Sequence, residues 1–313
     1  MKKSYLIFTL LLALGLLSLP ACDRVSNPYP PVVNLELDTT LYPGNWANYV
    51  ANEWPTFTTN TNTDRNVLIE DFTGHKCIFC PAAADLAHQL HEANPNRVFV
   101  ASIHSGVDGI GDFQSVDPEY TLDFTNQDGL AIGTWFGTHD GGFLGNPRGP
   151  ISRVNIGGVI FQSPGQWSSI TSTLLTENNL RVNMQSALNY YPSTKGAFLH
   201  VEVEKVDATL TNDLGIVAYV LEDSLVGDQK MSDNTHNHNY IHRDIHRKNL
   251  NHMPFGRQLL SSDLSNGKYY VNYSFVVPDQ LDGTYNASNM HVLVYVYDMT
   301  TLEIYQVIKQ KIQ

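Results

Sequence analysis

Residues 67–81 read VLIEDFTGHKCIFCP, and this stretch predicts how the first half of the chain folds. It begins with a short apolar run, long enough for a buried strand, and residues 82–93 after it have the periodicity of a helix. Two cysteines, Cys77 and Cys80, stand between the strand and the helix. A Cys-x-x-Cys pair at such a junction is typical of a redox site, where two thiols and a disulfide interconvert.

The N-terminus has the pattern of an export signal. Two lysines precede an apolar stretch at residues 5–17, and residues 19–22 then read LPAC. This tetrapeptide resembles a bacterial lipobox, in which cleavage precedes the cysteine and Cys22 receives acyl chains such as palmitate. Several acyl chains form a stable membrane anchor. We therefore expect a signal peptide at residues 1–21 and a lipid anchor at Cys22; ordinary secretory cleavage, leaving a free thiol, is the alternative.

Charge and cysteine count limit the possible functions. The 313 residues carry a net charge of −12, which argues against a nucleic-acid partner because binding phosphates requires a clustered positive surface. The chain has three cysteines, so acylation of Cys22 leaves only Cys77 and Cys80. A disulfide that encloses two residues removes little chain entropy. The pair is therefore better explained by chemistry than by stability.

The pattern along the chain predicts two folded domains after a tether. Residues 22–66 are rich in Pro, Asn and Thr and read as the tether, with some ordered structure around residues 46–54. In residues 67–180, predicted strands at 67–72 and 97–103 flank the helix at 82–93, and such a unit normally has parallel strands. Further elements expected in this domain are a helix within 120–136, a hairpin over 151–162 and a helix over 164–177.

Residues 181–313 lack this alternation of helix and strand and predict a separate β-sandwich domain. Apolar and polar residues alternate in its clearest segments. The strand candidates are 181–191, 197–206, 215–222, 268–277, 290–298 and 303–312.

The order of elements in the first domain resembles a thioredoxin fold. This resemblance implies that Asp71, six residues before Cys77, is the buried acidic residue of that fold. It also implies that Pro147 is the cis-proline that faces the cysteine pair, with Pro150 as the rival candidate. Asp71 and Glu70 alternate along the strand, so only one of them can point under the helix.

The complete arrangement resembles the outer-membrane-protein-28-related lipoprotein family. The resemblance rests on the motif E-x-F-T-G-x-x-C-x-x-C-P, which stands here at residues 70–81. It implies an α/β thioredoxin-like domain followed by an all-β sandwich domain, and a lipid-anchored protein of the bacterial cell envelope, most reasonably at the outer membrane.

These expectations define a function and an alternative. At a helix N-terminus the thiolate of Cys77 is favoured, with His75 and Lys76 adding positive charge, so Cys77 is the expected nucleophile. Cys80 is the expected resolving thiol, and Asp71 the proton acceptor that assists it. We expect thiol-disulfide exchange with a protein client and no cofactor. The alternative is a non-catalytic envelope or surface binding module in which the cysteines form a structural disulfide.

A second site is conceivable in residues 236–252, which hold five histidines. His242 and His246 are four residues apart, and on a helix both would lie on one face and could bind a metal. The segment has no thiols and no clear helical pattern. We therefore expect a solvated or interface-forming loop rather than a metal site.

Overall fold

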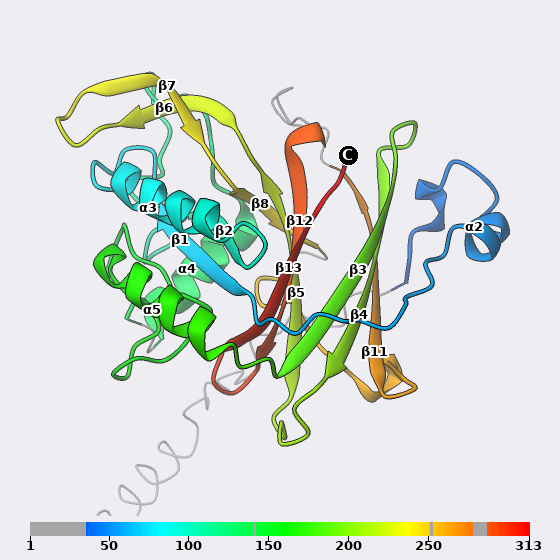
Figure 1. Cartoon of the computed structure of the whole chain (residues 1–313). Helices are drawn as coiled ribbons and strands as arrows, with labels where there is room; N and C mark the ends of the chain where they lie inside the picture. The colour runs from blue at the N-terminus through cyan, green and yellow to red at the C-terminus, as the bar shows by residue number, and fades with distance from the viewer. Residues whose placement is uncertain (1–35, 140–141, 251–252, 278–286) are drawn as a thin grey trace, which may run out of the picture. The chain divides into compact units, whose positions relative to one another are not determined.

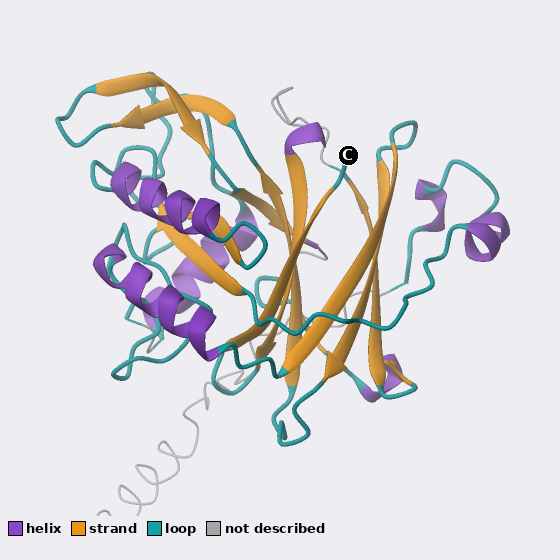
Figure 2. Ribbon diagram, in the orientation of Figure 1, coloured by secondary structure: helices purple, strands orange, loops and turns teal. Residues whose placement is uncertain are grey.

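The structure, a computed structural model, describes residues 36–139, 142–250, 253–277 and 287–313. Within these residues the larger of its sheets has seven strands (Figures 1 and 2). The first three strands across this sheet are parallel to one another, and the remaining neighbours are antiparallel. In spatial order they are β1 (Val67–Thr73), β2 (Val98–His104), β8 (Ile245–Asn249), β5 (Leu214–Glu222), β12 (Met290–Asp298) and β13 (Ile304–Lys311), with β9 (Arg257–Gln258) also paired to β5.

Helices cover both faces of the β1–β2 end of this sheet. Val67 and Ile69 pack with helices α3 (Cys80–Ala93) and α5 (Pro164–Glu177). Leu68 and Phe72 belong to a different cluster, which includes side chains of α4 (Gln127–Thr138). Because successive side chains on a strand point to opposite faces, residue 71 lies on the α3 side and residue 70 on the α4 side. The predicted strand-helix-strand unit is therefore confirmed, and its two acidic residues point in opposite directions.

A smaller sheet packs against the other end of the large one. Its core contains alternate residues of β5 and β12, facing apolar residues of the smaller sheet. All six strands expected in this part of the chain are present, within one or two residues at their ends. The smaller sheet runs β10 (Leu264–Ser265), β11 (Lys268–Val276), β4 (Gly196–Lys205) and β3 (Val182–Tyr191), and short 3-10 helices lie at Ser261–Asp263 (η3) and Ala287–Asn289 (η4).

The two halves of the chain share a sheet and a core. Strands β5 and β12 hydrogen-bond into the same sheet as β1 and β2. Tyr219 and Tyr295 from these strands belong to one apolar cluster with Leu68 and Phe72. The described residues between 36 and 313 accordingly form one compact unit. The expected boundary between residues 180 and 181 thus runs through a continuous structure, and the chain is a mixed α/β protein built mostly of strands.

Two local expectations differ from the structure. The helix expected within residues 120–136 begins only at Gln127, where the side chain of Asn126 caps it by accepting from the N–H of Gly129. The hairpin expected over residues 151–162 has isolated bridges rather than regular strands. The chain already turns at Ser152 and Arg153, directly after the bridge at Ile151. The φ angles of these two residues, 45° and 50°, lie in the left-handed region and interrupt the first strand that was expected.

The histidine-rich segment forms strands where a loop was expected. Strands β6 (Leu225–Lys230) and β7 (His236–His242) pair as a two-stranded sheet that projects beside α3 (Figure 1). Few apolar side chains occur in either strand, which is why hydrophobic periodicity did not reveal them.

The segment expected to be a tether is partly bound to the smaller sheet. It contains a 3-10 helix, η1 (Thr39–Leu41), and a short helix, α2 (Trp46–Asn52). The side chain of Tyr49 is fully buried, and its hydroxyl oxygen lies 2.6 Å from Nε2 of His200 on β4. The ordered structure expected around residues 46–54 is confirmed. The remainder of the expected tether up to residue 35, with Cys22, lies outside the described residues.

Candidate redox site

A disulfide joins Cys77 and Cys80 at the N-terminus of α3. Cys80 is the first residue of the helix, and Cys77 lies just before it with its N–H donating to the carbonyl of Gly74 (3.0 Å). Gly74 permits this turn because a Cβ there would lie 2.6 Å from the backbone oxygen of Phe113. Each cysteine is only 1% exposed, whereas Phe79 between them is 65% exposed. The disulfide is therefore covered, and its neighbour Phe79 faces solvent.

Asp71 lies on the α3 side of β1 and lines the same cavity as Cys80. Neither carboxylate oxygen has a hydrogen-bond partner among the described residues. Burial in this position raises the pKa of Asp71 from 3.8 to about 7. Near neutral pH the group can therefore both accept and donate a proton, as the resemblance to thioredoxins implied for this residue.

Glu70 is excluded from the site because it forms a buried ion pair on the opposite face of the sheet. Its carboxylate accepts from Nε and Nη2 of Arg153, both at 2.7 Å, and from the hydroxyl of Tyr219 at 3.0 Å. Arg153 Nη2 also donates to the hydroxyl oxygen of Tyr295 at 2.9 Å. Gly149 allows this chain segment to approach β1, since a Cβ there would lie 2.0 Å from the carbonyl oxygen of Glu70. No pattern in the sequence indicated Arg153, which follows an irregular segment.

The Asn146–Pro147 peptide bond is cis, as expected, and the rival Pro150 has no cis bond. The next residue, Arg148, pairs with Phe72 at the end of β1, where the N–H of Phe72 donates to the Arg148 carbonyl at 3.0 Å. Gln114 ties the two segments together, because its Nε2 donates to Thr73 O (2.7 Å) and to Asn146 Oδ1 (3.2 Å). Pro147 is thus held beside the chain that leads into the cysteine motif.

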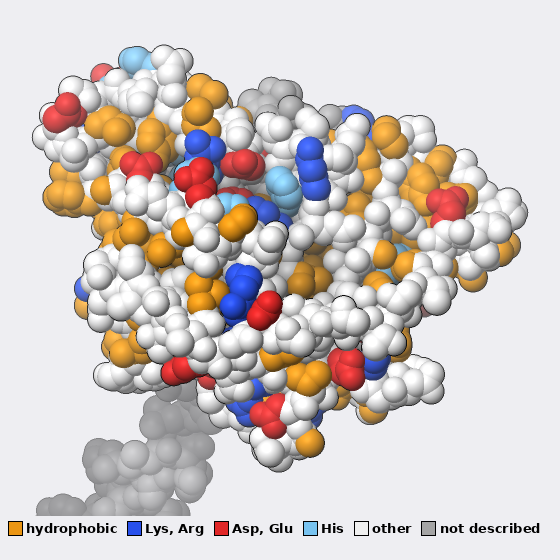
Figure 3. Space-filling model, in the orientation of Figure 1, with side chains coloured by type: hydrophobic (Ala, Val, Ile, Leu, Met, Phe, Trp, Pro, Cys, Tyr) orange, Lys and Arg blue, Asp and Glu red, His pale blue; other side chains and the backbone are white. Residues whose placement is uncertain are grey.

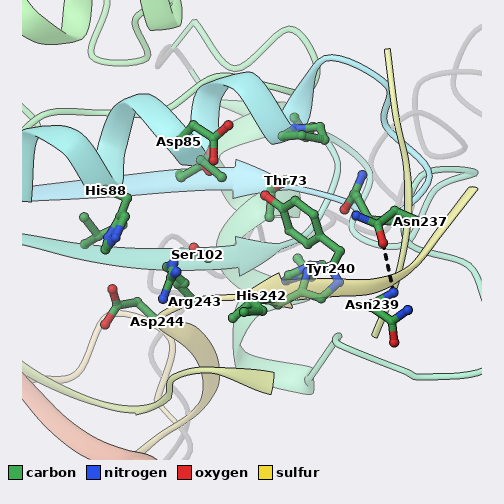
Figure 4. Close-up of a pocket in the computed structure, with 18 residues that line it drawn as sticks. Thr73, Asp85, His88, Ser102, Asn237, Asn239, Tyr240, His242, Arg243 and Asp244 are labelled. Carbon is green, nitrogen blue, oxygen red and sulfur yellow. Dashed lines mark hydrogen bonds between the residues drawn. The ribbon is translucent and has the colours of Figure 1, made fainter. Parts of the chain in front are cut away.

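A cavity of about 240 Å³ lies between α3 and the β6–β7 hairpin (Figure 4). Figure 4 shows the Tyr240 ring between strand β7 and the first turn of α3. Charged and histidine side chains gather on the molecular surface in this region (Figure 3). The residues that line the cavity include Asp71, Cys80, Asp85, His104, Gln229 and His242.

Two buried histidines that line this cavity, His104 and His242, are neutral near neutral pH. Burial lowers the pKa of His242 to about 4 and lowers that of His104 well below its usual range. His104 was not among the residues expected at the site. It lies at the carboxyl end of the parallel strand β2, next to the end of β1, and this position could have indicated it. These two histidines therefore give Asp71 no positive charge, and burial is the cause of its raised pKa.

The positive charge expected beside Cys77 is largely absent. Burial lowers the pKa of His75, whose Nε2 donates to the carbonyl of Ser115 at 3.1 Å. Lys76 forms an ion pair with Asp117 at 2.6 Å. The helix N-terminus is therefore the main electrostatic feature that would favour a thiolate here.

The β6–β7 hairpin contacts the cysteine motif directly. The N–H of Lys230 donates to the carbonyl of His75 at 2.8 Å. The side chain of Gln229, itself buried, donates to the carbonyl of Cys77 at 3.2 Å. Nothing in the sequence pattern of Gln229 indicated this role.

The two candidate metal ligands do not form the arrangement considered for them. His242 lies on β7 and its Nε2 is 3.3 Å from the carbonyl oxygen of Asp228. His246 lies on β8, where its Nε2 is 2.6 Å from Oδ1 of Asn249. Because they are on different strands, spacing along a helix does not bring them together.

Among the described residues no helix is long and apolar enough to cross a membrane. The chain resembles several solved structures. The structure of HBP35 of Porphyromonas gingivalis is similar with a TM-score of 0.60 and 15% identity, over 80% of this chain and 76% of that one, which shows a common fold. A domain of the outer membrane lipoprotein Omp28 from Porphyromonas gingivalis matches 43% of this chain and 90% of its own, with 18% identity and a TM-score of 0.28. An Agrobacterium tumefaciens protein matches with 10% identity and a TM-score of 0.47, over 82% of this chain and 97% of that one.

Comparison with curated proteins found no match. The family model described as outer membrane protein Omp28 matches residues 142–313, which is more than half of the chain. The protein therefore belongs to the Omp28 family of outer membrane proteins and is a protein of the outer membrane.

Proposed function

We propose that this protein carries out thiol-disulfide exchange with a protein client in the bacterial envelope, using a thioredoxin-like arrangement formed by residues 67–180. The observation that carries the proposal is the buried, unpaired carboxyl of Asp71, which lines one cavity with Cys80. A stable structural disulfide needs no proton acceptor beside it. A disulfide that opens and closes does, since one thiol must lose its proton for each bond that forms.

In the reducing direction, the thiolate of Cys77 attacks a client disulfide, which forms a mixed disulfide and releases one client thiolate. Cys80 then transfers its proton to Asp71 and attacks the Cys77 sulfur. This closes the Cys77–Cys80 disulfide and releases the second client sulfur as a thiolate. Two electrons pass to the client, and the reverse sequence oxidises client thiols. The cis-peptide segment at Pro147 would border the bound client.

Exchange requires access to a disulfide that is covered in the closed structure. The β6–β7 hairpin touches the motif through Gln229 and Lys230, and these contacts are two hydrogen bonds. Displacing the hairpin would break these two hydrogen bonds and the ring contacts of His236 with Tyr120 and of His242 with Phe124, and would expose Cys77 to a client. The cavity of about 240 Å³ is smaller than typical sites for drug-sized ligands, about 300–1,000 Å³, and suits a client side chain.

A lipid anchor at Cys22 is part of the proposal, since it would hold the domain at the membrane. The lipobox-like residues 19–22 and the family's outer-membrane location support it. Growth with labelled palmitate should label the wild-type protein and leave Cys22→Ser unlabelled.

A second candidate is a non-catalytic binding module, and the burial of both cysteines favours it. The two functions are separated by trapping in cells that express the full chain. Cys80→Ala cannot resolve a mixed disulfide, so client adducts should accumulate on Cys77 and disappear on reduction. Cys77→Ala is the matched control, because it also breaks the intramolecular disulfide but removes the nucleophile. Equal adducts on both variants, or none on Cys80→Ala, would leave the binding module as the better account.

A further inference from the structure

Three potential metal ligands meet on the β6–β7 hairpin, outside the redox cavity. They are Asp228 on β6 and His236 and His238 on β7, and one ligand atom from each lies within 4.8 Å of the others. The two histidines read as His-x-His along the strand. They are different residues from the pair that helical spacing suggested.

An irregularity in the hairpin brings these three side chains together. Gln229 pairs with Asn237, whereas Gly227 pairs with Tyr240. Between these pairs β6 has one residue, Asp228, and β7 has two, which is the pattern of a β-bulge. Oδ1 of Asp228 consequently accepts from Nε2 of His236 at 2.9 Å and from Nδ1 of His238 at 2.8 Å.

Two of the three ligands are held in place and the third faces water. The His236 ring stacks on Tyr120, with centroids 4.3 Å apart and planes 6° from parallel. The side chains of Asp228 and His236 are 19% and 20% exposed, and that of His238 is 70% exposed. The cluster is therefore organised on its inner side and leaves room for a further ligand on its outer side.

We propose that Asp228, His236 and His238 form a Zn²⁺ site with one position open to water. Imidazole and carboxylate are ligands that zinc accepts, and three protein ligands with an open fourth position are typical of accessible zinc sites. Zinc bonds to nitrogen and oxygen are about 2.0–2.2 Å, so tetrahedral ligand atoms lie about 3.3 Å apart. The Asp228 oxygen lies 2.9 and 2.8 Å from the two histidine nitrogens, so each of these distances would need to lengthen by about 0.5 Å. Each neutral imidazole would bind zinc through the nitrogen that now faces Asp228, with its ring hydrogen carried on the other nitrogen.

The site stands apart from the redox chemistry proposed above, because its three ligands are not among the residues that line the cavity with Cys80. Its position is nevertheless close, since Tyr120 stacks on His236 and also on His75. Zinc bound to the hairpin would stiffen the element that covers the disulfide.

The test is Zn²⁺ titration by calorimetry, using the full chain in detergent, purified without a histidine tag and treated with a chelator. Wild type should bind one Zn²⁺ per chain. His238→Ala should weaken binding by about 100-fold or more, since even a group that only supports a ligand is worth about 10–100-fold. His238 is mostly exposed, so the variant should unfold at the wild-type temperature.

His139→Ala is the matched control, because it removes another exposed histidine, outside the cluster. Asp228→Asn gives an independent check, since it keeps the size of the side chain and removes its charge. Failure of wild type to bind Zn²⁺ at tens of micromolar would overturn the proposal. Binding that His238→Ala and Asp228→Asn leave unchanged would also overturn it, because the ion would then be held elsewhere.

Discussion

Replacing Asp71 by Asn should change how the stability of the protein depends on pH. The pKa of Asp71 is raised from 3.8 to about 7 by burial, so the folded state binds its proton more tightly than the unfolded state. Below pH 3.8 both states are protonated and the carboxyl has no effect. As the pH rises toward 7 the unfolded state ionises first, and stability is lost progressively until both states are ionised. An asparagine cannot ionise and avoids this loss.

The expected size follows from the two pKa values. Between pH 4.5 and pH 8 the linkage costs wild type about 3 kcal/mol of unfolding free energy that the variant does not lose, at about 1.36 kcal/mol per pKa unit. Urea unfolding of the disulfide-bonded proteins at both pH values measures it. The difference between the two pH values removes the constant cost of burying the new amide. Asp85→Asn is the control, because Asp85 lines the same cavity but is exposed, and it should follow wild type. Parallel pH profiles for wild type and Asp71→Asn would refute the assignment of Asp71 as a buried proton acceptor.

Three further predictions test other parts of the structure. Arg153→Met should lower the free energy of unfolding, measured in urea, by about 3–5 kcal/mol, because Glu70 is left buried without its cation. Adding Glu70→Gln should recover part of this loss, and no recovery would show that the ion pair is not the cause. Gln229→Ala should speed reduction of the disulfide by dithiothreitol by about 5-fold, the value of a hydrogen bond of about 1 kcal/mol to the carbonyl of Cys77; an unchanged rate would mean that the hairpin does not limit access. Tyr49→Ala should cost about 3–5 kcal/mol, as for other large buried aromatic side chains, and should expose its segment to protease under native conditions; continued protection would contradict anchoring by this ring.

The elements with clear periodicity were predictable from the sequence. Strand β1, helix α3 and the strands of the smaller sheet have apolar residues at regular spacing, and their ends were placed to within a few residues. The β6–β7 hairpin was missed because its side chains are mostly polar and its pairing depends on a bulge. Hydrophobic periodicity therefore identified the strands and helices that pack into a core. It did not identify the β6–β7 hairpin, whose strands are mostly polar and are held together by backbone hydrogen bonds.

The site was predictable in part for a related reason. Cys77 and Cys80 were identified by their spacing, and Asp71 and Pro147 by resemblance. His104 lies at the end of β2, next to β1, and its position there could have indicated it. Gln229 comes from the distant strand β6, and only the three-dimensional structure brings it to the cysteines. His75 was expected to contribute positive charge at the site. Burial lowers its pKa and disfavours that charge, and the sequence alone does not show that this side chain is buried.

Glu70 and Asp71 are neighbours in the sequence but differ in their surroundings, and the partners of Glu70 help to join the two halves of the chain. These neighbouring carboxyl groups point to opposite faces of β1, and both are buried. On one face, Glu70 obtains Arg153 and the hydroxyl of Tyr219, which belongs to the C-terminal half. Removing that half would leave a buried charge with fewer partners, which is costly.

On the other face no such partner is present for Asp71 among the described residues, and the carboxyl responds by holding its proton up to about pH 7. The same strand thus supplies a stabilising ion pair and an uncompensated acid, and what differs is the set of groups on each face. If stability alone determined these positions, a neutral residue at 71 would serve better. The persistence of a buried acid beside Cys80, at a cost of several kcal/mol near neutral pH, is the strongest physical reason to assign the disulfide a chemical role.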